Sequence, residues 1–216
     1  FLPNNIGYFS YAEGLSAPRT DNLYTATIKG VLDNVDGNTI GDAADSILLL
    51  GVKPEKTQSY DLGYRFQGDT VTASVALWNN KFENRIVTDR NVGNVNLKGV
   101  DAELGWQATP ELTLYTSASY NKSELESDIQ VGVGQFLPTK GKELVETPEW
   151  TFAGRAQYKL GTDFVFGIQG KYVGERFSSD VNDEIAPSYT LFDADVTYDL
   201  TSLGLSSTLI QLNATN

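Results

Sequence analysis

Cysteine, histidine and methionine are all absent from this chain of 216 residues. Without cysteine there are no disulfide frameworks, thiolate metal sites or catalytic thiols, and without histidine the commonest general base and metal ligand is missing. These absences exclude most enzyme templates, and we expect no catalytic residues, no metal site and no cofactor. The first residue is Phe1 and no leader peptide follows it, so we expect the natural N-terminus to lie elsewhere.

Long apolar runs and an excess of positive charge are also missing. Although 40% of the residues are hydrophobic, nowhere do about 18 of them follow one another, which excludes a membrane-spanning helix. Any segment that crosses a membrane must then be a strand. The chain has 16 Lys and Arg against 28 Asp and Glu, a formal net charge of -12, which argues against a nucleic-acid partner.

Alternation of apolar and polar residues is the strongest positive signal. Between residues 59 and 67 every second residue is apolar: Tyr60, Leu62, Tyr64 and Phe66. The same period of two recurs at 71–77, 100–107, 112–121, 150–159, 164–175 and 192–200, and more weakly at 6–13 and 207–213. The pattern predicts an all-β chain of about nine strands, each with one apolar and one polar face.

The links between these strands alternate in length. Short links lie at 67–69, 108–110, 160–163 and 201–205, and long links rich in Asp, Asn, Gly and Ser lie at 14–57, 83–94, 122–149 and 176–188. Strict short-long order predicts an antiparallel meander with tight turns at one rim, which is typical of outer-membrane barrels. Apolar-face aromatics lie beside the short links, as an interfacial girdle would: Phe66, Trp106, Tyr158, Phe164 and Tyr198.

The strands of a soluble barrel or sandwich also alternate between apolar and polar residues, but such a fold encloses its apolar face. The composition of the two faces suits either arrangement, whereas the one-sided loops and the aromatic placement favour a transmembrane barrel. We therefore predict that Leu62, Val75, Leu104, Phe152 and Val196 face lipid. The predicted lumen-facing residues are Arg65, Glu103, Arg155, Lys171 and Asp195.

Several strings resemble one family. Its “LKPE…YE(L/I)G” entry to a strand, found in TonB-dependent outer-membrane receptors, resembles Gly51 to Thr57 followed by Tyr60 to Gly63. Further resemblances follow in family order: Asn91 to Asn94 with Lys98 to Leu104, Glu146 to Trp150, Tyr172 to Arg176, and Pro187 to Leu191. The resemblance implies a barrel of about 22 strands around an N-terminal plug. We expect residues 1–216 to be a barrel segment, without the plug domain, the early strands and the last strand.

The same resemblance implies a function. It implies a receptor in the bacterial outer membrane for energy-coupled uptake of a scarce solute, with a ferric siderophore as the expected ligand. The implied partners are the TonB complex, reached through the missing N-terminal region, and outer-membrane lipid. A passive porin-like channel and a barrel whose loops serve adhesion are alternatives, and a plug domain upstream of Phe1 would separate the first reading from both.

Four arginines flank or occupy the long links, where a ligand from outside would arrive first. Guanidinium groups there could contact the carboxylate or catecholate groups of a ferric siderophore. The alternative is that they pair with neighbouring acids or lipid headgroups. The candidate ligand-binding residues are Arg19, Arg85, Arg90 and Arg176.

Overall fold

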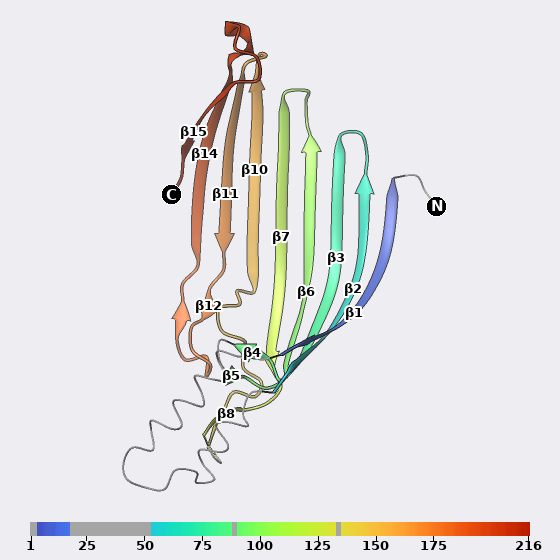
Figure 1. Cartoon of the computed structure of the whole chain (residues 1–216), viewed down its shortest axis with the longest axis vertical. Helices are drawn as coiled ribbons and strands as arrows, with labels where there is room; N and C mark the ends of the chain where they lie inside the picture. The colour runs from blue at the N-terminus through green and yellow to red at the C-terminus, as the bar shows by residue number, and fades with distance from the viewer. Residues whose placement is uncertain (1–3, 18–52, 88–89, 133–134) are drawn as a thin grey trace.

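The computed structural model describes residues 4–17, 53–87, 90–132 and 135–216. Nine strands form one antiparallel sheet in which neighbours along the chain are neighbours in space (Figure 1). This confirms the predicted meander. None of the described helices is long and apolar enough to span a bilayer. The strands are β1 (Asn5–Ser16), β2 (Glu55–Gln67), β3 (Val71–Glu83), β6 (Val95–Gln107), β7 (Leu112–Leu125), β10 (Trp150–Leu160), β11 (Phe164–Val173), β14 (Tyr189–Asp199) and β15 (Leu209–Ala214).

The two ends of the sheet differ, as the link lengths predict. Tight turns join β2 to β3, β6 to β7 and β10 to β11 at one end, where the 3-10 helix η1 (Leu200–Leu203) also follows β14 (Figure 1). At the other end, three links carry small two-stranded sheets of their own. These pair β4 (Ile86–Val87) with β5 (Arg90–Asn91), β8 (Ile129–Gly132) with β9 (Gln135–Leu137), and β12 (Arg176–Phe177) with β13 (Ile185–Ala186).

Several strands run further toward the long links than the alternation predicts. The β2–β3 ladder continues through Gln58 opposite Lys81 and Lys56 opposite Glu83. Backbone hydrogen bonds persist there although the face that carries Lys56, Gln58, Lys81 and Glu83 has become polar, so hydrophobic periodicity alone could not locate these strand ends.

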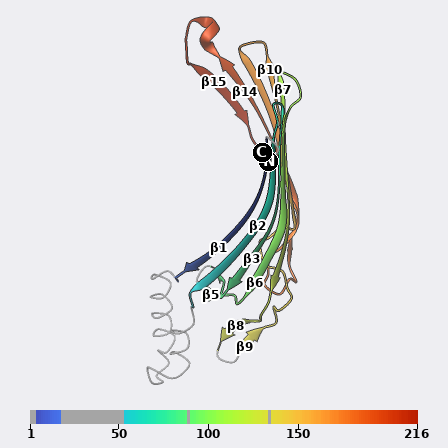
Figure 2. The same ribbon diagram turned by 90° about the vertical axis from the view of Figure 1, so that its right-hand side faces the viewer.

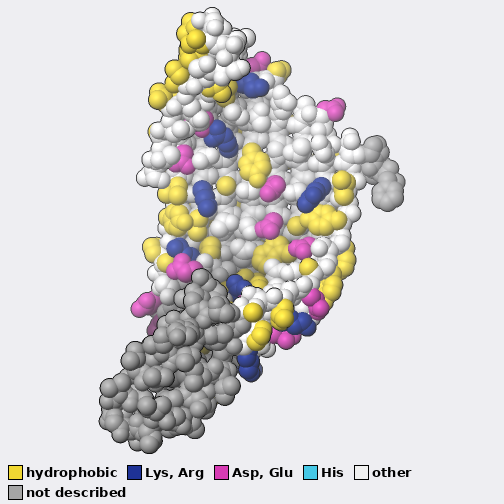
Figure 3. All heavy atoms as spheres, in the orientation of Figure 1, with side chains coloured by type: hydrophobic (Ala, Val, Ile, Leu, Met, Phe, Trp, Pro, Cys, Tyr) yellow, Lys and Arg dark blue, Asp and Glu magenta, His cyan; other side chains and the backbone are white. Residues whose placement is uncertain are grey.

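The sheet curves, and its polar face is the concave one. Figure 2 shows β1 and β15 bending toward the same side, and Figure 3 looks onto that side, where Lys, Arg, Asp and Glu side chains are spread over the strands. Leu62, Val75, Leu104 and Phe152 are exposed on the opposite, convex face, where Val196 is half-buried. A soluble barrel would place its apolar set inside, so this curvature favours a membrane barrel.

Side chains from β10 and β14 meet across the strand between them. Arg155 Nη2 lies 2.8 Å from Asp195 Oδ1, and both groups lie over Gly167 of β11. A Cβ atom at position 167 would meet both groups, so a side chain there would displace the ion pair. The contact also places Arg155 and Asp195 on one face, as predicted for the lumen.

Aromatic rings on the convex face form a group at each end of the sheet. Near the short turns, the rings of Phe164 and Tyr198 stack with centroids 4.5 Å apart. Toward the long links, Tyr120 and Trp150 lie 4.7 Å apart, and Tyr11 lies 5.0 Å from Tyr60. Two such groups correspond to the two interfacial belts of a membrane barrel.

The sheet is an open arc. Its order begins at β1 and ends at β15, and these two strands do not pair with each other in the described part of the chain. The predicted failure of the chain to close into a small autonomous barrel is therefore confirmed.

Candidate functional site

Three links at the long-loop end are hydrogen-bonded to one another. We call residues 84–94, 126–149 and 174–188, within the described ranges, the loop-end body. Glu126 donates its amide to the carbonyl of Asn94 (2.8 Å), which joins the first link to the second. Glu146 donates its amide to the carbonyl of Phe177 (2.9 Å), which joins the second to the third. The three links therefore form one connected unit.

Asn182 reinforces the junction of the second and third links. Its side-chain oxygen accepts the amide of Glu143 (2.7 Å), while its side-chain nitrogen donates to the carbonyl of Glu143 (3.0 Å). Asn182 has φ 58, a left-handed conformation that asparagine tolerates better than most residues. In this conformation the Asn182 side chain both accepts from and donates to the backbone of the neighbouring link.

A small apolar core lies beneath the loop-end body. Val92, Val95, Leu125 and Ile129 are each at most 2% exposed, and Phe82, Leu97, Leu137 and Leu144 pack against them. The fully buried hydroxyl of Thr139 accepts the Ile129 amide (3.0 Å) and donates to the Ser127 carbonyl (3.2 Å). Because the buried polar groups are hydrogen-bonded and the apolar side chains are packed, these links have a fixed shape.

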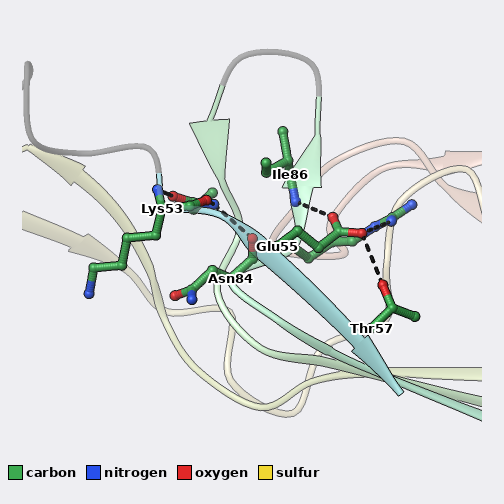
Figure 4. Close-up of polar contacts among 7 residues, drawn as sticks. Lys53, Glu55, Thr57, Asn84 and Ile86 are labelled. Carbon is green, nitrogen blue, oxygen red and sulfur yellow. Dashed lines mark hydrogen bonds and ion pairs between the residues drawn. The ribbon is translucent and has the colours of Figure 1, made fainter. Parts of the chain in front are cut away.

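Glu55 ties the start of β2 to the first link (Figure 4). Its side chain is buried and accepts hydrogen bonds from Arg85 Nη1 (2.9 Å), from the amide of Ile86 (2.7 Å) and from the hydroxyl of Thr57 (3.4 Å). The Arg85 guanidinium also lies 4.4 Å from the centroid of Phe82. Glu55 is the glutamate of the strand-entry string, so the resemblance has a structural basis at this position.

Asn91 makes a second tie beside Glu55. It accepts the amide of Lys53 (2.7 Å) and donates to the carbonyls of Lys53 (3.1 Å) and Asn84 (2.7 Å). Asn84 adopts φ 53, which turns the chain out of β3. Sequence reasoning assigned no role to Glu55 or Asn91, although both lie in the strings that carry the family resemblance.

Arg85 and Arg176, the two predicted arginines whose side chains the structure describes, lie on different links and pair with different acids. Arg85 is paired with Glu55, and Arg176 Nε lies 2.7 Å from Glu146 Oε2 on another link. The hydrogen bond to Glu146 raises the pKa of Arg176 above its ordinary value. Arg90 begins β5, opposite Val87, and Arg19 lies outside the described residues. Arg85 and Arg176 thus make the acid contacts that were the alternative to ligand binding.

The pKa of Glu143, in the second link of the loop-end body, is raised above its ordinary value. Partial burial is the larger cause, and the charge of Glu149 adds to it, while Lys122 opposes the shift. Its charged form is therefore less favourable in the folded loop than in the unfolded chain.

A polar ladder crosses the concave face of β10, β11 and β14. Besides its ion pair with Asp195, Arg155 donates to Gln169 (3.3 Å), and Gln169 donates to Asp193 (2.8 Å). In the described part of the chain, no group of three or more acids is placed to hold a metal ion. The arrangement offers hydrogen-bonding groups along a polar wall below the loop-end body.

Comparison with known proteins identifies related sequences. The ferrioxamine receptor of Yersinia enterocolitica is 29% identical over 175 residues, which are 76% of this chain and 24% of that protein. The ferrichrome outer membrane transporter/phage receptor of Escherichia coli K12 is 22% identical over 176 residues, 76% of this chain and 22% of that protein. The chain thus spans about a quarter of the length of these curated relatives.

Solved structures share the fold. The ferric yersiniabactin uptake receptor FyuA of Yersinia pestis superposes with a TM-score of 0.69 at 16% identity, covering 99% of this chain and 30% of that one. The siderophore receptor PiuA of Acinetobacter baumannii gives 0.68 at 20% identity, covering 97% and 29%. The family model described as “TonB dependent receptor-like, beta-barrel” matches residues 1–216. The chain therefore belongs to the TonB-dependent receptor β-barrel family.

Proposed function

We propose that residues 1–216 form part of the barrel wall of a bacterial outer-membrane receptor that imports a ferric siderophore with energy supplied through TonB. The plug domain, the early strands and the last strand would belong to the rest of a longer protein. The matched family and the share of its relatives that the chain spans support this proposal.

The main support for this proposal is the polar concave face, which lies beneath a loop-end body of fixed shape. A solute passing through a barrel needs a wall that can exchange hydrogen bonds with it, and the Arg155 ladder supplies such groups. The loop-end body stands at one end of that wall, where ligand specificity resides in loops rather than strands.

The ligand class rests on the named relatives. Ferrioxamine and ferrichrome receptors are among the sequence relatives, so ferrioxamine B and ferrichrome are the first substrates to test. Arg176 can exchange partners, because Glu146 is exposed. Arg85 is held by buried Glu55, and we assign it to positioning the first link. Arg19 and Arg90 remain proposed ligand contacts.

Uptake measured with and without TonB tests the mechanism. Cells that express the full-length receptor and lack other iron receptors are given radiolabelled ferrioxamine B, ferrichrome or ferric citrate. We expect uptake of at least one of the hydroxamate chelates, and its loss when TonB is deleted. Continued full uptake without TonB would reject energy coupling and favour the passive channel.

A further inference from the structure

The loop-end body carries more acids than bases. In its described part the basic residues are Arg85, Arg90, Lys140, Lys142 and Arg176. The acidic residues are Glu126, Asp128, Glu143, Glu146, Glu149, Glu175, Asp180, Asp183 and Glu184. The sequence of the long link at 18–52 has the same bias, with five Asp against one Arg and one Lys. Such an excess of carboxylates gives this end of the sheet a negative potential.

Ion pairs weaken the contribution of two of the bases to that potential. Arg85 is paired with Glu55 at 2.9 Å, and Arg176 is paired with Glu146 at 2.7 Å. Lys140 and Lys142 are exposed, but exposed acids outnumber them: Glu126, Asp128, Glu149, Glu175, Asp183 and Glu184. A cation that approaches the loop-end body is therefore attracted, and an anion is repelled.

Apolar side chains are exposed on the same links. Val131 of β8, Phe136 of β9 and Ile185 of β13 are 53%, 60% and 57% exposed. The described acids do not converge, because no three of them are placed to hold a metal ion together. A bare metal ion requires several oxygen ligands at one point. An organic cation with aliphatic segments instead matches a surface that combines negative potential with exposed apolar side chains.

We infer that the loop-end body selects ferric siderophores by charge, favouring a cationic hydroxamate chelate over anionic catecholate or citrate chelates. Three singly charged hydroxamate groups neutralise Fe³⁺, so a free ammonium group on the same chain makes the complex a cation at neutral pH. Three doubly charged catecholate groups leave the complex an anion. The inference rests on the proposed siderophore uptake and specifies the charge of the substrate.

Three derivatives of one siderophore test the selection. Ferrioxamine B has a free ammonium group, its N-acetyl derivative is neutral there, and its N-succinyl derivative carries a carboxylate, while the iron-binding chain is the same. Binding to the full-length receptor is measured by fluorescence quenching. At low salt we expect the cation to bind about tenfold more tightly than the anion, with the neutral derivative between them. The difference should shrink at about 1 M salt, where the Debye length is about 3 Å.

A pair of charge variants locates the effect. E126Q/E184Q removes two exposed acids from two links of the loop-end body and should narrow the cation-to-anion ratio by about threefold at low salt. The matched control D69N/E111Q removes two exposed acids from the tight-turn end and should leave the ratio unchanged. An equal narrowing in the control would overturn the assignment to the loop-end body.

The outcomes separate this inference from the proposed function. Equal affinity for the three derivatives, or a difference that persists unchanged at high salt, would overturn charge selection. If uptake of all three still required TonB, the proposed function would stand without it. Failure of the receptor to bind any of the three derivatives would overturn the inference, and the absence of TonB-dependent uptake of every siderophore tested would reject the proposed function.

Discussion

Glu55 and Arg85 form an ion pair of 2.9 Å that joins the first residue of β2 to the link after β3. The Glu55 side chain is 9% exposed and that of Arg85 is 33% exposed, so solvent screens the pair only in part. Glu55 also holds the Ile86 amide, so one carboxylate fixes both a side chain and the backbone of the neighbouring link.

Replacing Glu55 should loosen the loop-end body without unfolding the sheet. In E55Q, the charge-assisted bonds to Arg85 and Ile86 become weaker, and the local opening free energy should fall by about 1.5–3 kcal/mol. Hydrogen exchange at the Ile86 amide in the full-length receptor measures the change. Glu13 provides the control, because its 3.7 Å contact with Lys56 is exposed and E13Q should leave that amide unaffected. Unchanged exchange in E55Q would show that the pair does not hold the link.

Gly63 should be intolerant of a side chain because Tyr8 covers it. The Tyr8 ring occupies the place of a Cβ atom at position 63, and Arg65 lies 4.9 Å from the centroid of the same ring. We expect G63A to destabilise the receptor by about 1–3 kcal/mol through overpacking. Adding Y8A should cancel most of the steric part, and G14A, which meets nothing within 4 Å, is the control. Thermal unfolding of G63A, Y8A, G63A/Y8A and G14A measures the coupling, and strictly additive effects of G63A and Y8A would contradict the contact.

The two faces of the sheet should respond differently to one added charge. Leu104 lies on the convex face, and L104R should destabilise the membrane-inserted barrel by about 2–4 kcal/mol. Ser117 lies on the concave face opposite Glu103, and S117R should have a much smaller effect. Refolding of the full-length receptor into bilayers and its unfolding by denaturant give the comparison. Equal losses would mean that the faces are assigned wrongly.

Glu143 should make the loop-end body more stable in mild acid than at neutral pH. Its folded-state pKa is raised, so the folded loop binds more protons than the unfolded chain between the ordinary and the raised pKa. Stability therefore falls as the pH rises through that window. We expect E143Q to remove this dependence, seen as exchange of the residue 143 amide corrected for intrinsic rates, whereas the exposed control E124Q keeps it. A pH dependence that survives in E143Q would assign the effect to another group.

Arg176 should contribute to ligand affinity if it exchanges Glu146 for the siderophore. R176Q should weaken ferric siderophore binding by about tenfold, the loss of one charge-assisted contact. E146Q releases the guanidinium from its 2.7 Å ion pair and should leave binding intact or improve it. Fluorescence quenching titrations of the full-length receptor test both variants. Parallel losses in R176Q and E146Q would instead indicate that the pair shapes the link and does not touch ligand.

The positions of the strands could be predicted from the sequence because each strand lies between an apolar and a polar environment. Apolar residues such as Leu62 face one medium and polar residues such as Arg65 face the other. The sequence therefore alternates with a period of two, which can be recognised without tertiary information. The contacts of the loop-end body carry no such period. The hydrogen bonds between the Asn182 side chain and the Glu143 backbone join residues 39 positions apart, and their geometry depends on how two links meet. Arginines could be located from sequence, but their partners Glu55 and Glu146 could not be chosen among the many acids nearby.

The core shared by the first two links has a consequence for how binding preferences can change. Because Val92 and Ile129 come from two of the links and pack together with Leu125 of β7, these links are ordered before a ligand arrives, and little conformational entropy is lost on capture. The same coupling means that a new loop sequence must fit its neighbours as well as its ligand. Diversification should then proceed by exchanging the three links as a set, and grafting one of them alone should disturb the other two.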